Sequence, residues 1–194
     1  MKTKSVTSGR DRFAKHKDTI TAMVKLAGLL PRCVRKWLFN HIRMYNGYVG
    51  LVGRYVLIKT LAKSVGDNVA IFPGCYFEHV EKLSIGDNVS IHQMSYIDSE
   101  GGIDIGNNVS IAHRTSILSS NHGYKDKKIP IKYQKMKTAK TVIEDNCWIG
   151  CGVVILAGVT IGSGSVVGAN STVTKSLPEN VVAYGNPAKV GKTR

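Results

Sequence analysis

An aliphatic residue returns every six positions through most of the stretch from Val65 to Val173. The ladder consists of Val65, Ile71, Ile85, Ile91, Ile97, Ile103, Ile105, Ile111, Ile117, Ile143, Ile149, Ile155, Ile161, Val167 and Val173. A period of six matches neither the helical turn nor the two-residue alternation of a single strand. It indicates a repeat architecture, in which each unit buries its apolar residue against neighbouring units.

Three six-residue units make one triangular coil, with a short strand and a corner in each unit. We expect the aliphatic side chains to fill the prism and Gly, Asn or Asp to occupy its corners, where a positive φ is tolerated. Coils would start at 65, 85 and 105, and the next start at 143 leaves room for a long insertion. The pattern predicts an all-β solenoid, a parallel β-helix over residues 65–178, with an inserted loop at about 123–141 and a C-terminal tail at 179–194.

Residues 1–64 lie outside the repeat and carry most of the net charge. They hold 14 Lys or Arg against two acids, whereas residues 65–194 hold 13 Lys or Arg against 11 acids. The high isoelectric point could indicate nucleic-acid binding only by this N-terminal region, and the region contains no nucleic-acid motif. We therefore expect no nucleic-acid partner.

The basic region has the spacing of two helices, at about 11–29 and 32–63, parted by Pro31. Glycines near residue 50 predict a break in the second stretch. Apolar residues follow one side of that stretch at helical spacing, namely Val34, Trp37, Leu38, Ile42, Tyr45, Val49, Val52, Val56 and Leu61. The region would cap the first coil, and its basic amphipathic surface would also suit an anionic membrane or a lipid-linked substrate.

Targeting and redox signals favour a cytoplasmic protein, located at the inner face of the membrane if the basic region docks there. The first residues lack the continuous apolar segment and cleavage site of a signal peptide. No apolar run reaches the roughly 18 residues of a spanning helix. The cysteines Cys33, Cys75, Cys147 and Cys151 form no CxxC pair and suit a reducing compartment.

The insertion opens on a histidine, in the segment Ser119-Ser120-Asn121-His122-Gly123-Tyr124, and continues to Lys140 with seven lysines and one Asp. A loop of this length inside a regular repeat is usually functional. An imidazole with a pKa near 6.5 suits proton transfer at neutral pH. His122 is therefore either a general base or a corner histidine satisfied by hydrogen bonds. The lysines are either a solvated loop or a surface that attracts anionic groups.

The C-terminal half resembles a known family. The segment Ile143-Glu144-Asp145-Asn146-Cys147-Trp148-Ile149-Gly150 and the segment Gly185-Asn186-Pro187-Ala188-Lys189 are very similar to the signature of the galactoside/maltose O-acetyltransferase branch of the hexapeptide-repeat acyltransferases. The similarity is close over 143–190 and looser over 65–142. It implies a left-handed parallel β-helix, a homotrimer, acetyl-CoA as the acyl donor and no metal. Together with the helices expected before residue 64, the fold is a left-handed parallel β-helix with an N-terminal α-helical extension.

The resemblance also implies roles for individual residues. His122 would be the general base that takes the proton from an acceptor hydroxyl, which attacks the thioester directly. On the acceptor side we expect His92, His113, Asn121 and Trp148, although relatives tend to have Asn where His92 stands. In the cofactor groove we expect Gly150, Cys151, Ala169, Thr174, Lys175, Lys189 and Lys192. The structural alternatives are corner turns for the glycines and a trimer-interface anchor for Trp148.

The basic N-terminal helices resemble those of acetyltransferases of capsule, exopolysaccharide or lipopolysaccharide assembly. We therefore expect transfer of an acetyl group to a sugar hydroxyl of a surface polysaccharide or a lipid-linked glycan precursor. Three alternatives remain: N-acetylation of an amino sugar or nucleotide-sugar, acetylation of a streptogramin-type antibiotic, and a trimeric scaffold without activity. Zinc-dependent carbonic anhydrases share the fold, but no closely spaced histidine pair accompanies His122.

Overall fold

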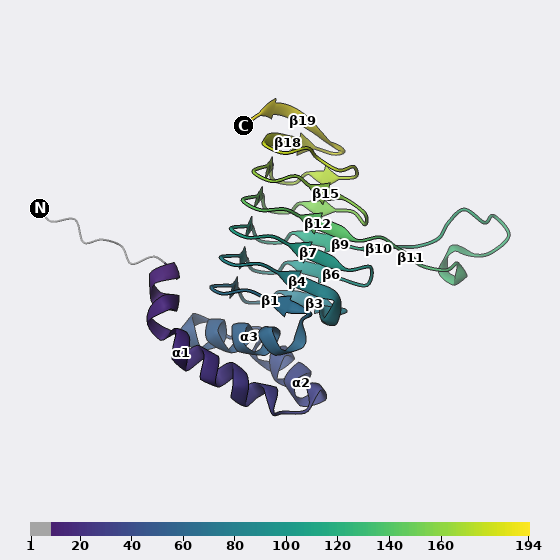
Figure 1. The fold of residues 1–194 in the computed structure, drawn as a ribbon. Helices are drawn as coiled ribbons and strands as arrows, with labels where there is room; N and C mark the ends of the chain where they lie inside the picture. The colour runs from purple at the N-terminus through teal and green to yellow at the C-terminus, as the bar shows by residue number, and fades with distance from the viewer. Residues whose placement is uncertain (1–8) are drawn as a thin grey trace, which may run out of the picture.

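The computed structural model describes residues 9–194, which form a helical cap and a triangular β-prism (Figure 1). The cap contains α1 (Gly9–Gly28), α2 (Arg32–Ile42) and α3 (Gly47–Leu61). The second helix expected at 32–63 is thus two helices. Gly47, the first residue of α3, adopts a φ of 75°, which a right-handed helix does not accommodate in its interior, so the chain turns there and a separate helix begins.

The prism has three sheets, one on each face, and all are parallel apart from the β18–β19 hairpin that ends the second sheet. The first sheet contains β1 (Ser64–Val65), β4 (Leu83–Ile85), β7 (Ile103–Ile105), β12 (Thr141–Ile143) and β15 (Thr160–Ile161). The second contains β2 (Ala70–Ile71), β5 (Ser90–Ile91), β8 (Ser110–Ile111), β13 (Trp148–Ile149), β16 (Val166–Val167), β18 (Val181–Gly185) and β19 (Ala188–Thr193). The third contains β3 (Tyr76–Glu78), β6 (Tyr96–Asp98), β9 (Ser116–Leu118), β14 (Val154–Ile155) and β17 (Thr172–Val173).

The six-residue ladder fills the interior of the prism, as predicted. Ile71 pairs with Ile91, and Ile91 pairs with Ile111, in register across the second sheet. All three side chains are fully buried, and the equivalent residues of the other two sheets form the same continuous core. The β-solenoid of about six coils is therefore confirmed.

At the first corner, which joins the first sheet to the second, Gly and Asn meet different structural requirements. The positive φ falls on Asn residues, such as Asn88 (φ 57°), while the preceding Gly86 is not left-handed. Gly86 is needed for close approach, because a Cβ there would lie 2.7 Å from the carbonyl carbon of Gly106 in the next coil. In the coil that starts at Ile161, Gly164 (φ 72°) takes the place of Asn at this corner, and Gly152 carries a positive φ at the second corner, which joins the second sheet to the third.

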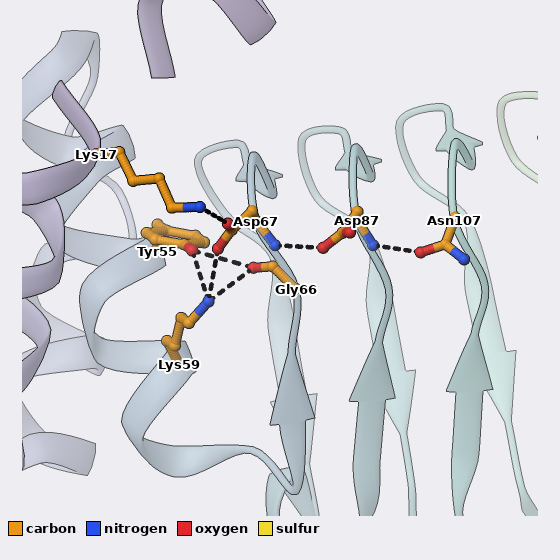
Figure 2. Close-up of polar contacts among 7 residues, drawn as sticks. All are labelled: Lys17, Tyr55, Lys59, Gly66, Asp67, Asp87 and Asn107. Atoms are coloured by element: carbon orange, nitrogen blue, oxygen red, sulfur yellow. Dashed lines mark hydrogen bonds and ion pairs between the residues drawn. The ribbon is translucent and has the colours of Figure 1, made fainter. Parts of the chain in front are cut away.

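Polar side chains at the first corner also form a ladder along the prism (Figure 2). Asp87 Oδ1 accepts the backbone N–H of Asp67 at 2.7 Å, and Asn107 Oδ1 accepts that of Asp87 at 2.8 Å. Asp145 Oδ1 accepts the N–H of Asn107 at 2.7 Å, although a long insertion separates the two coils in sequence. Each corner is thereby tied to the next by a side chain.

The helical cap is fastened to the open end of this ladder (Figure 2). Lys17 of α1 and Lys59 of α3 place their Nζ atoms 2.7 and 3.1 Å from the two oxygens of Asp67. Lys59 and the hydroxyl of Tyr55 also donate to the carbonyl of Gly66. The hydrogen bond from Lys17, with a smaller contribution from Lys59, holds the pKa of Asp67 below its usual value.

A buried arginine fixes the turn between α2 and α3. Arg54 Nε donates to the carbonyl of Ile71 at 2.7 Å, and its Nη1 donates to the carbonyls of Ile42 and Tyr45. Burial lowers the pKa of Arg54, and these carbonyls accept hydrogen bonds from its Nε and Nη1. The cap thus closes the first coil, in agreement with the simpler of the two roles considered for residues 1–64.

The segment expected as a tail at 179–194 forms a hairpin instead. β18 continues the second sheet beside β16, and β19 returns antiparallel to β18. Leu177 and Ala183 are buried and extend the inward ladder above Ile161 and Val167. The hairpin therefore covers the second end of the core.

Candidate active site

His122 lies at the root of the inserted loop, at the third corner, where the third sheet passes to the first. The loop projects sideways from the prism (Figure 1) on an antiparallel stem of β10 (Ser120–Asn121) and β11 (Lys137–Thr138). His122 is the first residue beyond β10, and its side chain is exposed. The loop tip contains a 3₁₀ turn at Ile131–Tyr133.

A buried carboxylate anchors this root. Asp98, at the end of β6, is only 8% exposed. Its Oδ2 accepts the hydroxyl of Ser120 at 2.6 Å, and its Oδ1 lies 3.1 Å from both Nδ1 of His79 and the backbone nitrogen of Glu100. Burial raises the pKa of Asp98, but these hydrogen bonds outweigh it and hold the pKa below its usual value. A charged group thus fixes the strand that ends just before His122.

Sequence reasoning missed Asp98 and assigned no role to His79. The available signal was an acid at the end of a strand one coil before the loop, where neighbouring coils stack in register. Asp98 pairs with Leu118 in that register, so it lies below the segment that leads to His122. His79 adopts a φ of 50°, a conformation that is uncommon for residues other than Gly and Asn and that aims its ring at Asp98.

Glu78, His79 and Asp98 also form a group whose ligand atoms all lie within 4.8 Å of one another. Carboxylate and imidazole groups are common metal ligands. Here both oxygens of Asp98 already accept hydrogen bonds from protein donors. The group is accounted for by its hydrogen bonds, and we assign no metal to it.

The second corner contains two further candidate histidines, His92 and His113. His92 stacks on Phe72 of the coil before it, with ring centroids 4.5 Å apart. His113 lies at the same corner in the next coil. In the register of the sheet it is level with the residue that follows His92. Burial lowers the pKa of His92, and the nearby charge of His113 lowers it further. His92 is therefore a neutral, half-buried imidazole at neutral pH.

Small residues form the upper part of this corner. Gly150 approaches the next coil so closely that a Cβ there would lie 2.6 Å from the backbone nitrogen of Ala169. Cys151 is half-buried and Ala169 is exposed, so the outer surface carries no bulky side chain at these positions. Trp148 projects from the second sheet two residues before Gly150 and is largely exposed.

The remaining candidates lie elsewhere. Thr174 and Lys175 are exposed at the third corner, and Lys189 and Lys192 are exposed on β19. A single chain therefore places most of the predicted residues at two corners, one on each side of the third sheet, while Trp148, Lys189 and Lys192 lie on the second sheet. His122, Asn121, Thr174 and Lys175 lie on one side, whereas His92, His113, Gly150, Cys151 and Ala169 lie on the other.

Comparison with known proteins identifies the family. The family "Bacterial transferase hexapeptide (six repeats)" matches residues 140–175. The protein named colanic acid biosynthesis acetyltransferase WcaF of Escherichia coli K12 is 34% identical over 141 residues, which cover 73% of this chain and 75% of WcaF. The chain belongs to the hexapeptide-repeat acetyltransferases.

Other members of the hexapeptide-repeat acetyltransferases agree with this assignment. A galactoside acetyltransferase solved in complex with coenzyme A superposes with a TM-score of 0.74 at 28% identity, over 97% of this chain and 92% of that one. The galactoside O-acetyltransferase of Lactococcus lactis is 57% identical over 51 residues. That match spans only about a quarter of each protein, 26% of this chain and 25% of the relative.

Proposed function

We propose that this protein is an acetyl-CoA-dependent O-acetyltransferase whose acceptor is a sugar hydroxyl of a surface polysaccharide or a lipid-linked glycan precursor. The observation that carries the proposal is the exposed imidazole of His122 at a loop root fixed by buried Asp98. Family membership and the relative solved with coenzyme A support the acyl donor. The name of WcaF supports a polysaccharide acceptor.

In the proposed reaction, His122 accepts the proton of the acceptor hydroxyl as its oxygen attacks the thioester carbonyl carbon of acetyl-CoA. The tetrahedral intermediate then collapses, the carbon–sulfur bond breaks, and the proton passes from His122 to the leaving thiolate. The products are the acetyl ester and free coenzyme A. The thioester is already activated, so no acyl-enzyme intermediate is required.

We infer that each active site lies between two chains of a homotrimer. The candidate residues occupy both edges of the third sheet, so one chain cannot bring them together. In a cyclic trimer each chain offers different surfaces to its two neighbours, and the two edges could then meet across an interface. The third sheet would face the symmetry axis, with His122 of one chain opposite the second corner of the next.

Small side chains at Gly150, Cys151 and Ala169 would leave space for the extended pantetheine arm along the second corner. Thr174 and Lys175, and the exposed Lys189 and Lys192 of β19, would meet the amide and phosphate groups of the cofactor. No metal takes part in the proposed reaction. His92, His113, Asn121 and Trp148 would line the acceptor side.

The first prediction concerns His122. With acetyl-CoA and a panel of sugars, amino sugars, nucleotide-sugars and glycan oligomers, we expect acceptor-dependent release of free thiol. His122→Ala should lower kcat by about 100-fold or more, because general-base catalysis contributes about that much. The matched control His16→Ala, an exposed histidine on α1, should keep wild-type turnover.

The same assay decides between the alternatives. Turnover restricted to amino sugars or nucleotide-sugars would indicate that the accepting group is an amine and not a hydroxyl. Turnover of a streptogramin alone would indicate antibiotic acetylation. Equal turnover by His122→Ala and wild type would contradict the assignment of the base. A chain that binds no acetyl-CoA in calorimetry would be a scaffold.

A further inference from the structure

Helix α1 carries exposed apolar side chains next to its packed side near its C-terminal end. Ile20, Val24 and Ala27 lie on the side that packs against the rest of the cap. Met23 and Leu26, three residues apart on one face of the helix, are exposed, Leu26 by 66%. Leu30, just beyond the end of α1, is also exposed. Packing among residues 9–194 gives no reason for these side chains to be apolar.

The exposed apolar surface continues through the α1–α2 junction. Leu29 is 81% exposed, and Trp37, one and a half turns into α2, is 57% exposed. Helical spacing places Val34 and Trp37 on the same apolar side as Leu38, but both are exposed in the structure. The packed side of α2 consists of Leu38, Phe39 and Ile42. We name the exposed set the cap patch; it consists of Met23, Leu26, Leu29, Leu30, Val34 and Trp37.

The cap patch is set among positive charges. From Met23 to Trp37 the chain contains Lys25, Arg32, Arg35 and Lys36 and no acid. Arg32 lies 2.9 Å from Glu81, and Lys25 and Lys36 are exposed. Exposed Leu and Trp side chains among Lys and Arg are the combination that binds the interface of an anionic bilayer.

The position of the cap patch also suits a planar surface. The α1–α2 junction lies at the end of the molecule opposite the C-terminus, away from the prism and its inserted loop (Figure 1). A flat partner could therefore reach the junction without contacting the third sheet or either candidate corner. No helix within residues 9–194 is long and apolar enough to cross a membrane.

We propose that the cap patch docks this protein on the surface of an anionic lipid bilayer, with the apolar residues at the level of the headgroups and the basic residues on lipid phosphates. A second copy of the chain suits the patch less well, because a self-complementary contact would bring like charges together. The proposal goes beyond the proposed acetyl transfer and does not depend on it.

Vesicle sedimentation of the full chain tests the proposal. We expect binding to phosphatidylcholine vesicles that contain phosphatidylglycerol to be at least about tenfold stronger than binding to phosphatidylcholine alone, since each basic residue near an anionic surface adds about 1 kcal/mol. Binding should weaken as salt rises from about 0.1 M to 1 M, where the screening length falls to about 3 Å.

The variant Leu26→Ser/Leu29→Ser should bind the mixed vesicles at least about tenfold more weakly, because two apolar side chains are lost from the contact. The control Ile129→Ser/Ile131→Ser changes two exposed aliphatic residues of the inserted loop, 44% and 57% exposed, and should bind like wild type. Both variants should keep wild-type thiol release and the wild-type mass in solution.

Three results would overturn the proposal: no binding of wild type to the mixed vesicles, equal binding of the Leu26→Ser/Leu29→Ser variant, or a lower mass in solution for that variant. The last would identify the cap patch as an interface between copies. Vesicle binding needs neither an acyl donor nor an acceptor, so failure here is distinguishable from failure of the proposed acetyl transfer.

Discussion

At the scale of single residues, the candidate base depends on a group that does no chemistry itself in the proposed reaction. Asp98 holds Ser120, and Ser120 begins the short strand that ends next to His122. His79 and the amide of Glu100 complete the shell of donors around Asp98. We therefore regard Asp98 as a positioning residue for His122.

The second prediction concerns the pH dependence of this anchor. The pKa of Asp98 is lowered in the folded chain, so its contribution to stability is present above the unfolded value of about 3.9 and is lost as pH falls through the folded value. Asp98→Asn should lower the free energy of unfolding at pH 7 by about 1–3 kcal/mol. The difference from wild type should shrink as pH falls from the unfolded value through the folded value. Urea titrations at pH 7 and at successively lower pH values measure it.

Asp126→Asn, at the exposed tip of the same loop, is the control for the loss of one negative charge and should change stability little. Asp98→Asn should also reduce kcat more than it raises KM if it displaces His122 without removing an acceptor contact. A variant that loses stability but keeps wild-type kcat would show that Asp98 has a structural role alone.

At the scale of elements, the cap is joined to the prism through one corner. Asp67 is the first acceptor of the corner ladder and also the ion-pair partner of α1 and α3 (Figure 2). Burial lowers the pKa of Lys59, but its bonds to Tyr55 and Asp67 outweigh that effect and raise it. Helices and strands that are far apart in sequence thus share one polar cluster.

The third prediction concerns this junction. Asp67→Asn should lower the free energy of unfolding by about 1 kcal/mol or less, because the pairs are partly exposed and screened by solvent. It should speed hydrogen exchange of amides in α1 more than in the prism. The control Asp18→Asn removes an exposed acid of α1 and should leave exchange unchanged. Equal exchange in both variants would mean that apolar packing alone holds α1.

At the scale of the whole molecule, the two edges of the third sheet carry different parts of the proposed site. The outward side chains of that sheet include Tyr76 and Tyr96, whose rings stack with centroids 5.8 Å apart, and the half-buried Val154. Uncharged side chains of this kind suit a subunit interface. The outward face of the first sheet has a depression of about 560 Å³ that contains neither His122 nor His92.

The fourth prediction tests which face meets the symmetry axis of the proposed trimer. If that trimer forms through the third sheet, Val154→Glu, on the outer face of that sheet, should convert it to monomers and lower turnover by about 100-fold or more, because a charge would be buried at the interface without a partner. Val142→Glu is the matched control, a half-buried outward valine in the first sheet. Sedimentation and thiol release measure both. Dissociation by Val142→Glu alone would place the first sheet at the axis instead.

The period of the sequence was sufficient to predict the solenoid and its core. Inward positions are equivalent in every coil, so one apolar residue in six identifies them without knowledge of other contacts. Ile71, Ile91 and Ile111 are buried as expected. The loop root was also predictable, because His122 stands where the repeat breaks. The family signature near Trp148 added the acyl donor as an expectation.

Only the tertiary structure shows which residues of different coils and helices come into contact. Asp98 and Ser120 are more than one coil apart in sequence, and only the stacking of coils brings their oxygens to 2.6 Å. Helical spacing does not show which side of a helix is covered by the rest of the molecule. It placed Trp37 on one apolar side with Leu38, yet Trp37 is exposed and Leu38 belongs to the packed side of α2. Local spacing determines which residues are equivalent, whereas long-range packing determines which of them are neighbours.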